Sequence, residues 1–167
     1  MLLYIWVYKK PNKLIGTESS SYKRLQSQAY YNFLMQYDII SFDIFDTLIL
    51  RAVLNSTDLY YLIGMKLQYI GFKEIREQAE IEARYRLGLD DTDDVTLYDI
   101  YFIVNEWCGI DVEKGIKAEL EIEYSISFAN PYWIELIKEL VGAGKKVIAT
   151  TDMYISELNI RKLLQYH

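Results

Sequence analysis

Two short apolar runs, each ending in carboxylates and hydroxyls, interrupt an otherwise helical pattern of hydrophobic and polar positions. Residues 38–43 are rich in isoleucine and end at Asp43, whereas residues 145–152 begin with lysines, continue through an apolar middle and end in Thr151 and Asp152. Bounded apolar runs of this length predict buried strands. Because helices separate them and both are apolar throughout, we expect the strands to lie parallel in one sheet.

Helical periodicity covers most of the remaining chain. Ser56 and Thr57 offer N-caps, Thr96 and Asp99 form a predicted capping box, and Pro131 suits the first position of a helix. The predicted helices cover residues 23–36, 56–70, 72–87, 96–107, 112–127, 131–141 and 156–165, the last with Ser156 as its N-cap. The pattern therefore predicts an α/β fold in which many helices separate two parallel strands.

Several side chains are expected to take structural roles within these helices. Trp133, Ile134, Ile137 and Leu140 form the predicted buried stripe of one helix. Arg76, Glu80 and Arg84 are spaced by four residues in another helix and are expected to form ion pairs, although Arg84 is also a candidate for an anionic substrate. These residues are therefore expected to contribute mainly to packing and to surface ion pairs, and less to catalysis or binding.

The carboxyl ends of the two strands are the strongest candidate for chemistry. Ligands bind beyond the carboxyl ends of strands in open α/β sheets, and parallel strands bring those ends together. We therefore expect Asp43, Thr47, Thr151 and Asp152 to meet in one crevice, with the intervening helices as a lid. The structural alternative is that Asp43 and Asp46 are turn and helix-cap residues of a loop.

Composition narrows the classes of function. The chain has 167 residues, the size of one domain or of one domain with a helical insertion, and its net charge is −6. Without a basic patch, binding to nucleic acid or to an anionic membrane is not expected. The apolar run at the N-terminus is too short to span a bilayer, and its charges follow it, unlike those of a signal peptide. We predict a cytoplasmic protein with no membrane span.

Other candidate sites receive less support from the sequence. Cys108 is the single cysteine and His167 the single histidine, so neither a Cys–His pair nor a zinc site is predicted. The acidic cluster at residues 90–94 lacks the glycine and final glutamate of a calcium loop. The 16 tyrosines suggest a stacking surface for sugar or nucleic acid, but their helical spacing favours core positions. A carbohydrate-binding module is disfavoured because the pattern is not all-β.

The two strand ends resemble motifs of the haloacid dehalogenase-like hydrolase superfamily. Residues 43–47, Asp-Ile-Phe-Asp-Thr, resemble its first motif, and Thr151 in Ala-Thr-Thr-Asp-Met-Tyr resembles its second. Residues 38–167 are similar to a subgroup of predicted hydrolases from bacterial surface-polysaccharide gene clusters, which are often fused to glycosyltransferases or encoded beside them. The resemblance implies a glycosyltransferase domain or protein as a partner.

The resemblance also implies a domain organisation. The fold would be a partial Rossmann-like parallel sheet core with a helical cap inserted between the first two core strands. Residues 38–55 and 130–167 would form the incomplete core and residues 56–129 the cap, preceded by an extension at 1–37 made of a short strand or loop and a helix. The chain ends where a third-motif lysine and fourth-motif acids would follow, which implies a truncated product or part of a longer protein.

The implied activity is magnesium-dependent hydrolysis of a small phosphorylated molecule, such as a phosphorylated sugar, through an aspartyl-phosphate. Asp43 would be the nucleophile, because Thr47 then falls four residues later, as in the first motif. Asp43 and the backbone carbonyl of Phe45 would bind Mg²⁺, and Thr151 would donate a hydrogen bond to a phosphoryl oxygen. The further candidates for substrate contacts are Asp46, Asp152 and Arg51.

One departure from the family pattern leaves two functions open. Phosphatases of the superfamily usually carry a second aspartate two residues after the nucleophile, and this chain has Phe45 there. Asp46, one position further, is expected to point elsewhere and to act as a turn-capping or supporting residue. The missing third-motif lysine and fourth-motif acids are a heavier departure, and they favour the alternative to a hydrolase, a catalytically inactive fragment or interaction domain that partners a glycosyltransferase.

Overall fold

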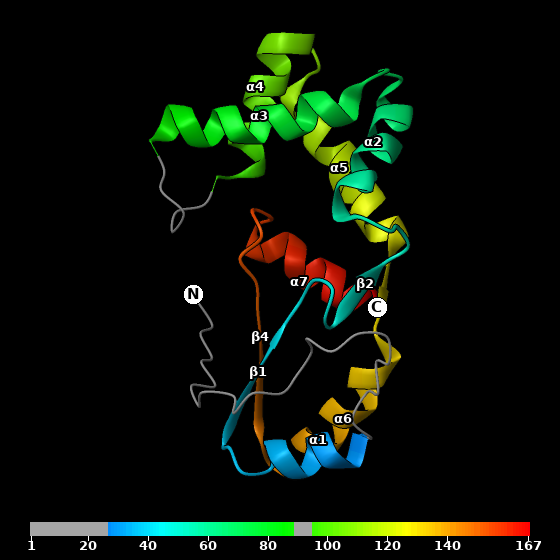
Figure 1. Cartoon of the computed structure of the whole chain (residues 1–167), viewed down its shortest axis with the longest axis vertical. Helices are drawn as coiled ribbons and strands as arrows, with labels where there is room; N and C mark the ends of the chain where they lie inside the picture. The colour runs from blue at the N-terminus through cyan, green and yellow to red at the C-terminus, as the bar shows by residue number, and fades with distance from the viewer. Residues whose placement is uncertain (1–26, 89–94) are drawn as a thin grey trace, which may run out of the picture. The chain divides into compact units, whose positions relative to one another are not determined.

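The computed structural model describes residues 27–88 and 95–167. The strand or loop predicted within the extension at residues 1–37 lies outside these residues, as do the acidic cluster at 90–94 and the beginning of the helix predicted from residue 23. The described chain is a mixed α/β structure made mostly of helices (Figure 1). Its elements are α1 (Ser27–Leu34), β1 (Ile39–Asp43), β2 (Ile49–Arg51), the 3₁₀-helix η1 (Ser56–Asp58), α2 (Leu59–Leu67), α3 (Phe72–Leu87), α4 (Leu97–Cys108), α5 (Val112–Ile126), β3 (Ser127–Ala129), α6 (Pro131–Gly142), β4 (Lys146–Thr150) and α7 (Glu157–Tyr166).

The two predicted strands pair in parallel, which confirms the central expectation from the sequence. β1 and β4 run in register from Ile39 opposite Lys146 to Asp43 opposite Thr150. Their register places the last residue of each strand side by side. The carboxyl ends of two segments that lie far apart in sequence therefore converge.

A small hydrophobic core packs α1 and α6 against this sheet. Ile40 and Phe42 alternate on β1 with more exposed residues and point into the core, as expected for a strand with one covered face. The buried members of the core are Leu34, Ile40, Phe42, Leu136 and Leu140. The predicted stripe of α6 was therefore incomplete, since Leu136 is buried whereas Trp133 and Ile137 are only partly buried.

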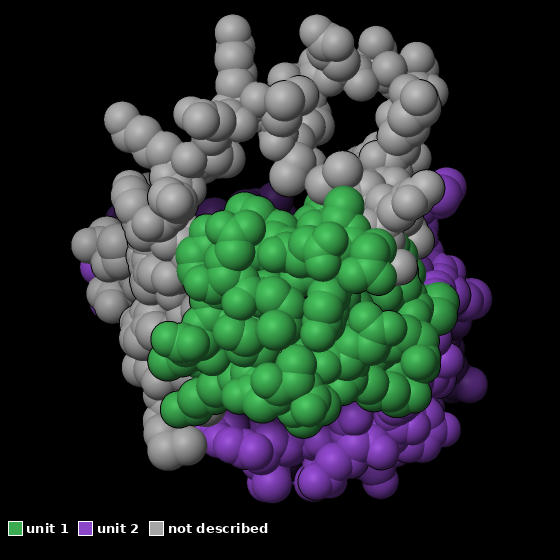
Figure 2. All heavy atoms as spheres, turned by 90° about the horizontal axis from the view of Figure 1, so that it is seen from below, with its two compact units in different colours: residues 1–50, 129–151 green, residues 51–128, 152–167 purple. Residues whose placement is uncertain are grey.

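The chain divides into two compact units (Figure 2). Among the described residues, 27–50 and 129–151 form the first, here called the sheet unit, and 51–88, 95–128 and 152–167 form the second, the helical unit. The predicted core of residues 38–55 and 130–167 and the cap of residues 56–129 stay a prediction. The closing helix α7 belongs to the helical unit. There Tyr124 donates a hydrogen bond to the carbonyl of Asn159, 3.1 Å away, and Ile160 is buried.

Two short strands were missed by the sequence reading. β2 and β3 contain three residues each, too few to show a period, and they pair with each other. Nearby, the N–H of Ala52 donates to the carbonyl of Ile126 over 2.8 Å. The chain leaves and re-enters the sheet unit through these two strands.

The boundaries of α2 differ from the prediction. The cap before η1 is Asn55, which forms a capping box with Asp58, rather than Ser56 or Thr57. α2 ends at Leu67, and the left-handed Gln68 follows it. A Cβ atom on Gly64 would lie 2.8 Å from Cβ of Phe72, so α2 passes close to the start of α3 and the chain must turn before Gly71. The predicted capping box of Thr96 and Asp99 at the start of α4 is confirmed.

Candidate functional site at the strand ends

The loop after β1 begins at the predicted nucleophile. Asp43 is the last residue of β1 and its side chain is exposed. The hydroxyl of Thr47 donates to a carboxylate oxygen of Asp43 over 3.3 Å. The loop is held by backbone hydrogen bonds from Leu48 to the carbonyl of Asp43, at 3.4 Å, and from Ile49 to that of Ile44, at 2.8 Å. The predicted association of Asp43 with Thr47 is therefore present.

The last residue of β4, Thr150, lies beside the end of β1 and contributes a hydroxyl to this edge of the sheet. Thr150 lies opposite Asp43, and its carbonyl accepts a hydrogen bond from Ile44 N–H at 3.0 Å. The hydroxyls of Thr150 and Ser41 are hydrogen bonded to each other at 3.0 Å. Thr151 follows directly and is partly buried. From the sequence we predicted a role for Thr151 and none for Thr150 or Ser41. Because side chains alternate between the two faces of a strand, the position of Ser41 next to the apolar Phe42 could have placed Ser41 on the same face as Asp43.

Asn130 connects the loop after β1 to the start of α6, a role that the sequence reading missed. Its side-chain amide donates to the carbonyl of Thr47 over 2.9 Å, and its backbone N–H donates to the carbonyl of Leu48 over 2.7 Å. Its side-chain oxygen also caps α6 by accepting from the N–H of Tyr132 at 3.2 Å. Asn before Pro131 is a known start signal for a helix, but nothing local reveals the distant carbonyl.

Asp46 takes the turn position that the sequence reading favoured for it. Its backbone is left-handed, with φ of 57°, and its side chain is exposed. Aspartate tolerates this conformation better than most residues, because its short side chain hydrogen bonds locally. The backbone of Phe45 pairs with that of Ile49, and its side chain is buried. A substrate contact from Asp46 stays a prediction.

The predicted magnesium ligands at the strand ends are few, so water and substrate oxygens would have to complete the coordination shell. Among the described residues, no group of three or more His, Cys, Asp or Glu side chains is arranged to hold a metal ion. Magnesium usually retains water and binds through one or two carboxylates together with substrate phosphates. Asp43 and the carbonyl of Phe45, the predicted ligands, would supply two oxygens to such a site and would not form a complete protein cage.

The remaining predicted substrate residues lie in the helical unit. The Arg51 side chain is almost completely buried, and its Nε lies 2.7 Å from a carboxylate oxygen of Glu123. The hydroxyl of Ser127 donates to the same oxygen over 3.1 Å. This ion pair gives Arg51 a structural role that the sequence did not indicate. Asp152 also belongs to this unit, and its substrate role stays a prediction.

A buried polar cluster around Arg76 and Glu119 in the helical unit was also not predicted. Arg76 is fully buried, and its Nε and Nη2 donate to the two carboxylate oxygens of Glu119 over 2.8 and 2.9 Å. Tyr101 donates to Glu119 over 2.8 Å. Burial alone would lower the pKa of Arg76, but the Glu119 carboxylate keeps that pKa well above its ordinary value. The predicted pair with Glu80 exists at 3.2 Å but is the outer part of this cluster.

Glu80 also completes the predicted charge ladder on α3. Nη2 of Arg84 lies 3.6 Å from the second carboxylate oxygen of Glu80. The side chain of Arg84 is about one-third exposed. The predicted pairing with Glu80 is confirmed, and a substrate contact from Arg84 stays a prediction.

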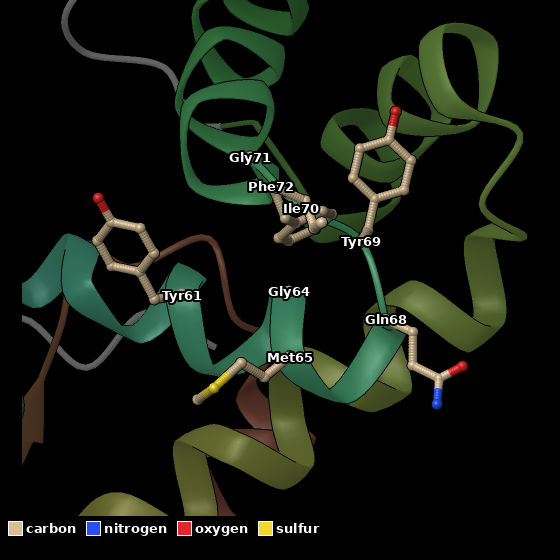
Figure 3. A pocket seen from close by; sticks show the side chains of 8 residues that line it. All are labelled: Tyr61, Gly64, Met65, Gln68, Tyr69, Ile70, Gly71 and Phe72. Atoms are coloured by element: carbon tan, nitrogen blue, oxygen red, sulfur yellow. The ribbon is translucent and has the colours of Figure 1, made fainter.

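A shallow groove of about 500 Å³ lies between the end of α2 and the start of α3 (Figure 3). Its lining is mainly apolar and includes Tyr61, Met65, Tyr69 and Ile70. Neither carboxylates nor cationic side chains line it. The groove therefore offers no acid–base or metal chemistry comparable to that at the strand ends.

Comparison with models of known protein families and with curated proteins finds no match to this chain. Among the described residues, no helix has both the length and the apolar character needed to cross a bilayer. Any assignment of function therefore depends on the geometry at the strand ends and on the motif resemblance.

Proposed function

We propose that this chain carries the nucleophile half of a haloacid dehalogenase-like hydrolase site that acts on a small phosphorylated molecule. One observation carries the proposal: Asp43, hydrogen bonded to Thr47, ends a strand whose parallel neighbour ends beside it at Thr150, directly before Thr151. An exposed carboxylate at the carboxyl end of a parallel strand occupies the place where such sheets bind ligands. The resemblance of both segments to the first two superfamily motifs supports the same assignment.

The proposed reaction is a double displacement at phosphorus. An oxygen of Asp43 attacks the phosphorus atom in line, and the bond to the leaving oxygen breaks with its electron pair. The leaving oxygen takes a proton from solvent water, because Phe45 stands where the superfamily's usual acid would be. A water molecule then attacks the phosphorus of the aspartyl-phosphate and loses a proton to solvent, and the bond between phosphorus and Asp43 breaks, which releases phosphate and restores the carboxylate. The hydroxyl of Thr151 donates a hydrogen bond to a phosphoryl oxygen, and the N–H groups near Asp46 and Thr47 hold the others.

Asp43 and the carbonyl of Phe45 would bind Mg²⁺, which reduces the repulsion between the attacking carboxylate and the phosphate. The protein would supply few of the metal ligands, so metal and phosphate should bind cooperatively. This expectation distinguishes the hydrolase from the alternative, an inactive interaction domain partnering a glycosyltransferase. In both proposals the core is Rossmann-like and residues 56–129 serve as a helical cap.

The deciding experiment is calorimetric titration of Mg²⁺ with and without beryllium fluoride, which mimics an aspartyl-phosphate. The wild-type protein should bind the two cooperatively, and Asp43→Asn should abolish the effect. Asp38→Asn is the matched control, because Asp38 is an exposed carboxylate just before the other end of β1, near Lys145 at 3.8 Å. Absence of coupling in folded wild-type protein would reject the hydrolase in favour of the interaction domain.

A further inference from the structure

Two consecutive peptide groups in the loop after β1, Thr47–Leu48 and Leu48–Ile49, are each hydrogen bonded at both ends. On the N–H side, Leu48 donates to the carbonyl of Asp43 over 3.4 Å, and Ile49 donates to the carbonyl of Ile44 over 2.8 Å. These two bonds connect the loop to the last residue of β1 and to the residue that follows it. The carbonyl side of both peptide groups faces a different part of the chain.

Asn130, the residue before α6, binds the carbonyl side of both peptide groups. Its side-chain amide donates to the carbonyl of Thr47 over 2.9 Å, and its backbone N–H donates to the carbonyl of Leu48 over 2.7 Å. Because a peptide group is planar, hydrogen bonds to its N–H and to its carbonyl together fix its orientation. The amide is itself fixed, since Asn130 is buried and its side-chain oxygen accepts from the N–H of Tyr132.

The loop needs this support because one of its residues has an unfavourable backbone conformation. Asp46 is left-handed, with φ of 57°, a region that residues other than glycine rarely adopt. Such a conformation persists only where the surrounding structure imposes it. The next residue is Thr47, whose hydroxyl lies 3.3 Å from a carboxylate oxygen of Asp43. Asn130 therefore helps to fix the backbone that carries this hydroxyl.

We propose that Asn130 is a positioning residue, which holds the peptide groups after Thr47 and so keeps the Thr47 hydroxyl at the Asp43 carboxylate. All three residues belong to the sheet unit. Asn130 acts through Thr47 and need not contact phosphate itself. The relevance to phosphate rests on the proposed function, whereas the support of the loop does not.

Asn130 also caps α6, so the variants must separate its two roles. Asn130→Ser retains a cap, because serine is about as good an N-cap as asparagine, but its shorter side chain has no amide to reach the carbonyl of Thr47. Asn130→Ala removes both roles. Asp111→Ala is the matched control, since Asp111 caps α5 in the helical unit by accepting from the N–H of Lys114 at 2.9 Å.

Hydrogen exchange resolved by NMR tests the support of the loop. In Asn130→Ser, the amides of Leu48 and Ile49 should exchange about two to ten times faster, because the net contribution of one hydrogen bond corresponds to a factor of that size. The amide of Tyr132 should keep its rate, since the cap remains. Wild-type rates at Leu48 and Ile49 in Asn130→Ser, or equal acceleration in Asp111→Ala, would overturn the support.

Magnesium-dependent binding of beryllium fluoride tests the positioning role. Asn130→Ser and Asn130→Ala should each weaken it about two- to tenfold. Asp111→Ala should bind as the wild type does, although loss of its cap lowers its stability. This pattern separates positioning from general stability, because Asn130→Ser keeps its cap and remains informative if Asn130→Ala does not fold.

Two results would overturn the positioning role, namely unaltered binding in Asn130→Ser or equal weakening in Asp111→Ala. Absence of binding in the wild type would reject the proposed function and with it this role. Hydrogen exchange at Leu48 and Ile49 would still decide whether Asn130 holds the loop.

Discussion

Carboxylates serve opposite purposes in the two units of this chain. In the helical unit, Glu119 and Glu123 are almost fully buried and each accepts hydrogen bonds from an arginine and a hydroxyl. In the sheet unit, Asp43 lies exposed at the end of β1, with the Thr47 hydroxyl 3.3 Å away. Buried charges require complete pairing, since an unpaired ion in the interior is costly. An exposed carboxylate at a strand end carries no such constraint and can bind a ligand.

The contrast teaches that charge alone does not identify a site. Arg51 was a predicted substrate residue and Asp43 the predicted nucleophile, but in the structure the Arg51 side chain is almost completely buried whereas Asp43 is exposed. Both arginines pair with buried glutamates of the helical unit, Arg51 with Glu123 and Arg76 with Glu119, and a substrate contact from Arg51 stays a prediction. The comparison between the units can be tested by removing one polar group at a time.

The largest effect is expected for Glu119→Gln. This change removes the buried counter-ion of the Arg76 guanidinium and leaves only the partly exposed Glu80, which should lower the free energy of unfolding by about 3–5 kcal/mol. Urea denaturation followed by circular dichroism measures it. The control is Glu80→Gln, because Glu80 also contacts Arg76 but is partly exposed, and it should cost less than about 1 kcal/mol. Equal losses in the two variants would show that burial does not distinguish the carboxylates.

A smaller loss is expected for Gly115→Ala in the same cluster. A Cβ atom at Gly115 would overlap the ring of Tyr101, whose hydroxyl donates to Glu119. Overpacking of this kind should cost about 1–3 kcal/mol of unfolding free energy, again measured with urea. Gly142→Ala serves as the control, since no atom lies within 4 Å of its added Cβ. A neutral Gly115→Ala would mean that Tyr101 moves without disturbing the buried carboxylate.

The sheet unit should respond most to Asn130→Ala, at about 1–2 kcal/mol. The change removes both the cap of α6 and the hydrogen bond to the carbonyl of Thr47. Hydrogen exchange should therefore accelerate at the amides of Leu48 and Ile49, with little change in α3. Acceleration confined to the first turn of α6 would show that Asn130 is only a cap and does not hold the loop after Asp43.

The smallest effect on stability is expected for the ion pair between Lys73 and Asp58 in the helical unit, and it should depend on pH. The hydrogen bond from Lys73 lowers the pKa of Asp58 below its ordinary value of 3.8. Because the folded-state pKa is the lower one, the stabilisation is present above pH 3.8 and is lost as the pH falls through the folded-state value.

The stability difference between wild type and Asp58→Asn should therefore be complete at neutral pH and disappear in strong acid. Urea midpoints measured across this range give the curve. Lys73→Met removes the same pair from its other side and should show the same dependence. A difference that persists in strong acid would assign the effect to the capping hydrogen bonds with Asn55 instead of to charge.

The sequence predicted the elements that have strong local signals. The strand ending at Asp43, the helix over residues 72–87 and the capping box at Thr96 all agree with the structure, because periodicity and capping are encoded within a few residues. Parallel pairing of the two strands was also predicted, since both are apolar runs separated by helices. These features place Asp43 and Thr150 at one edge of the sheet.

The features that were missed depend on contacts between distant residues. Arg76 has the spacing of a surface residue in its helix, and only the arrival of Glu119 from α5 makes its burial possible. Asn130 shows its capping role locally, but its bond to the carbonyl of Thr47 joins residues far apart in sequence. The assignment of α7 to the helical unit likewise rests on Tyr124 and on buried residues of α7 itself. Local patterns contain no information about such partners.

Because β2 pairs with β3, residues 52–126 form an insertion that another sequence could in principle replace. The two ends of this stretch are joined by the hydrogen bond from Ala52 to Ile126, so an insertion of any length between them begins and ends at neighbouring points. Insertions with adjacent ends are tolerated well, because the host chain need not change its path to accept them. Through evolution or engineering, the helices at this position can be exchanged for others while the path of β1 to Asp43 is retained.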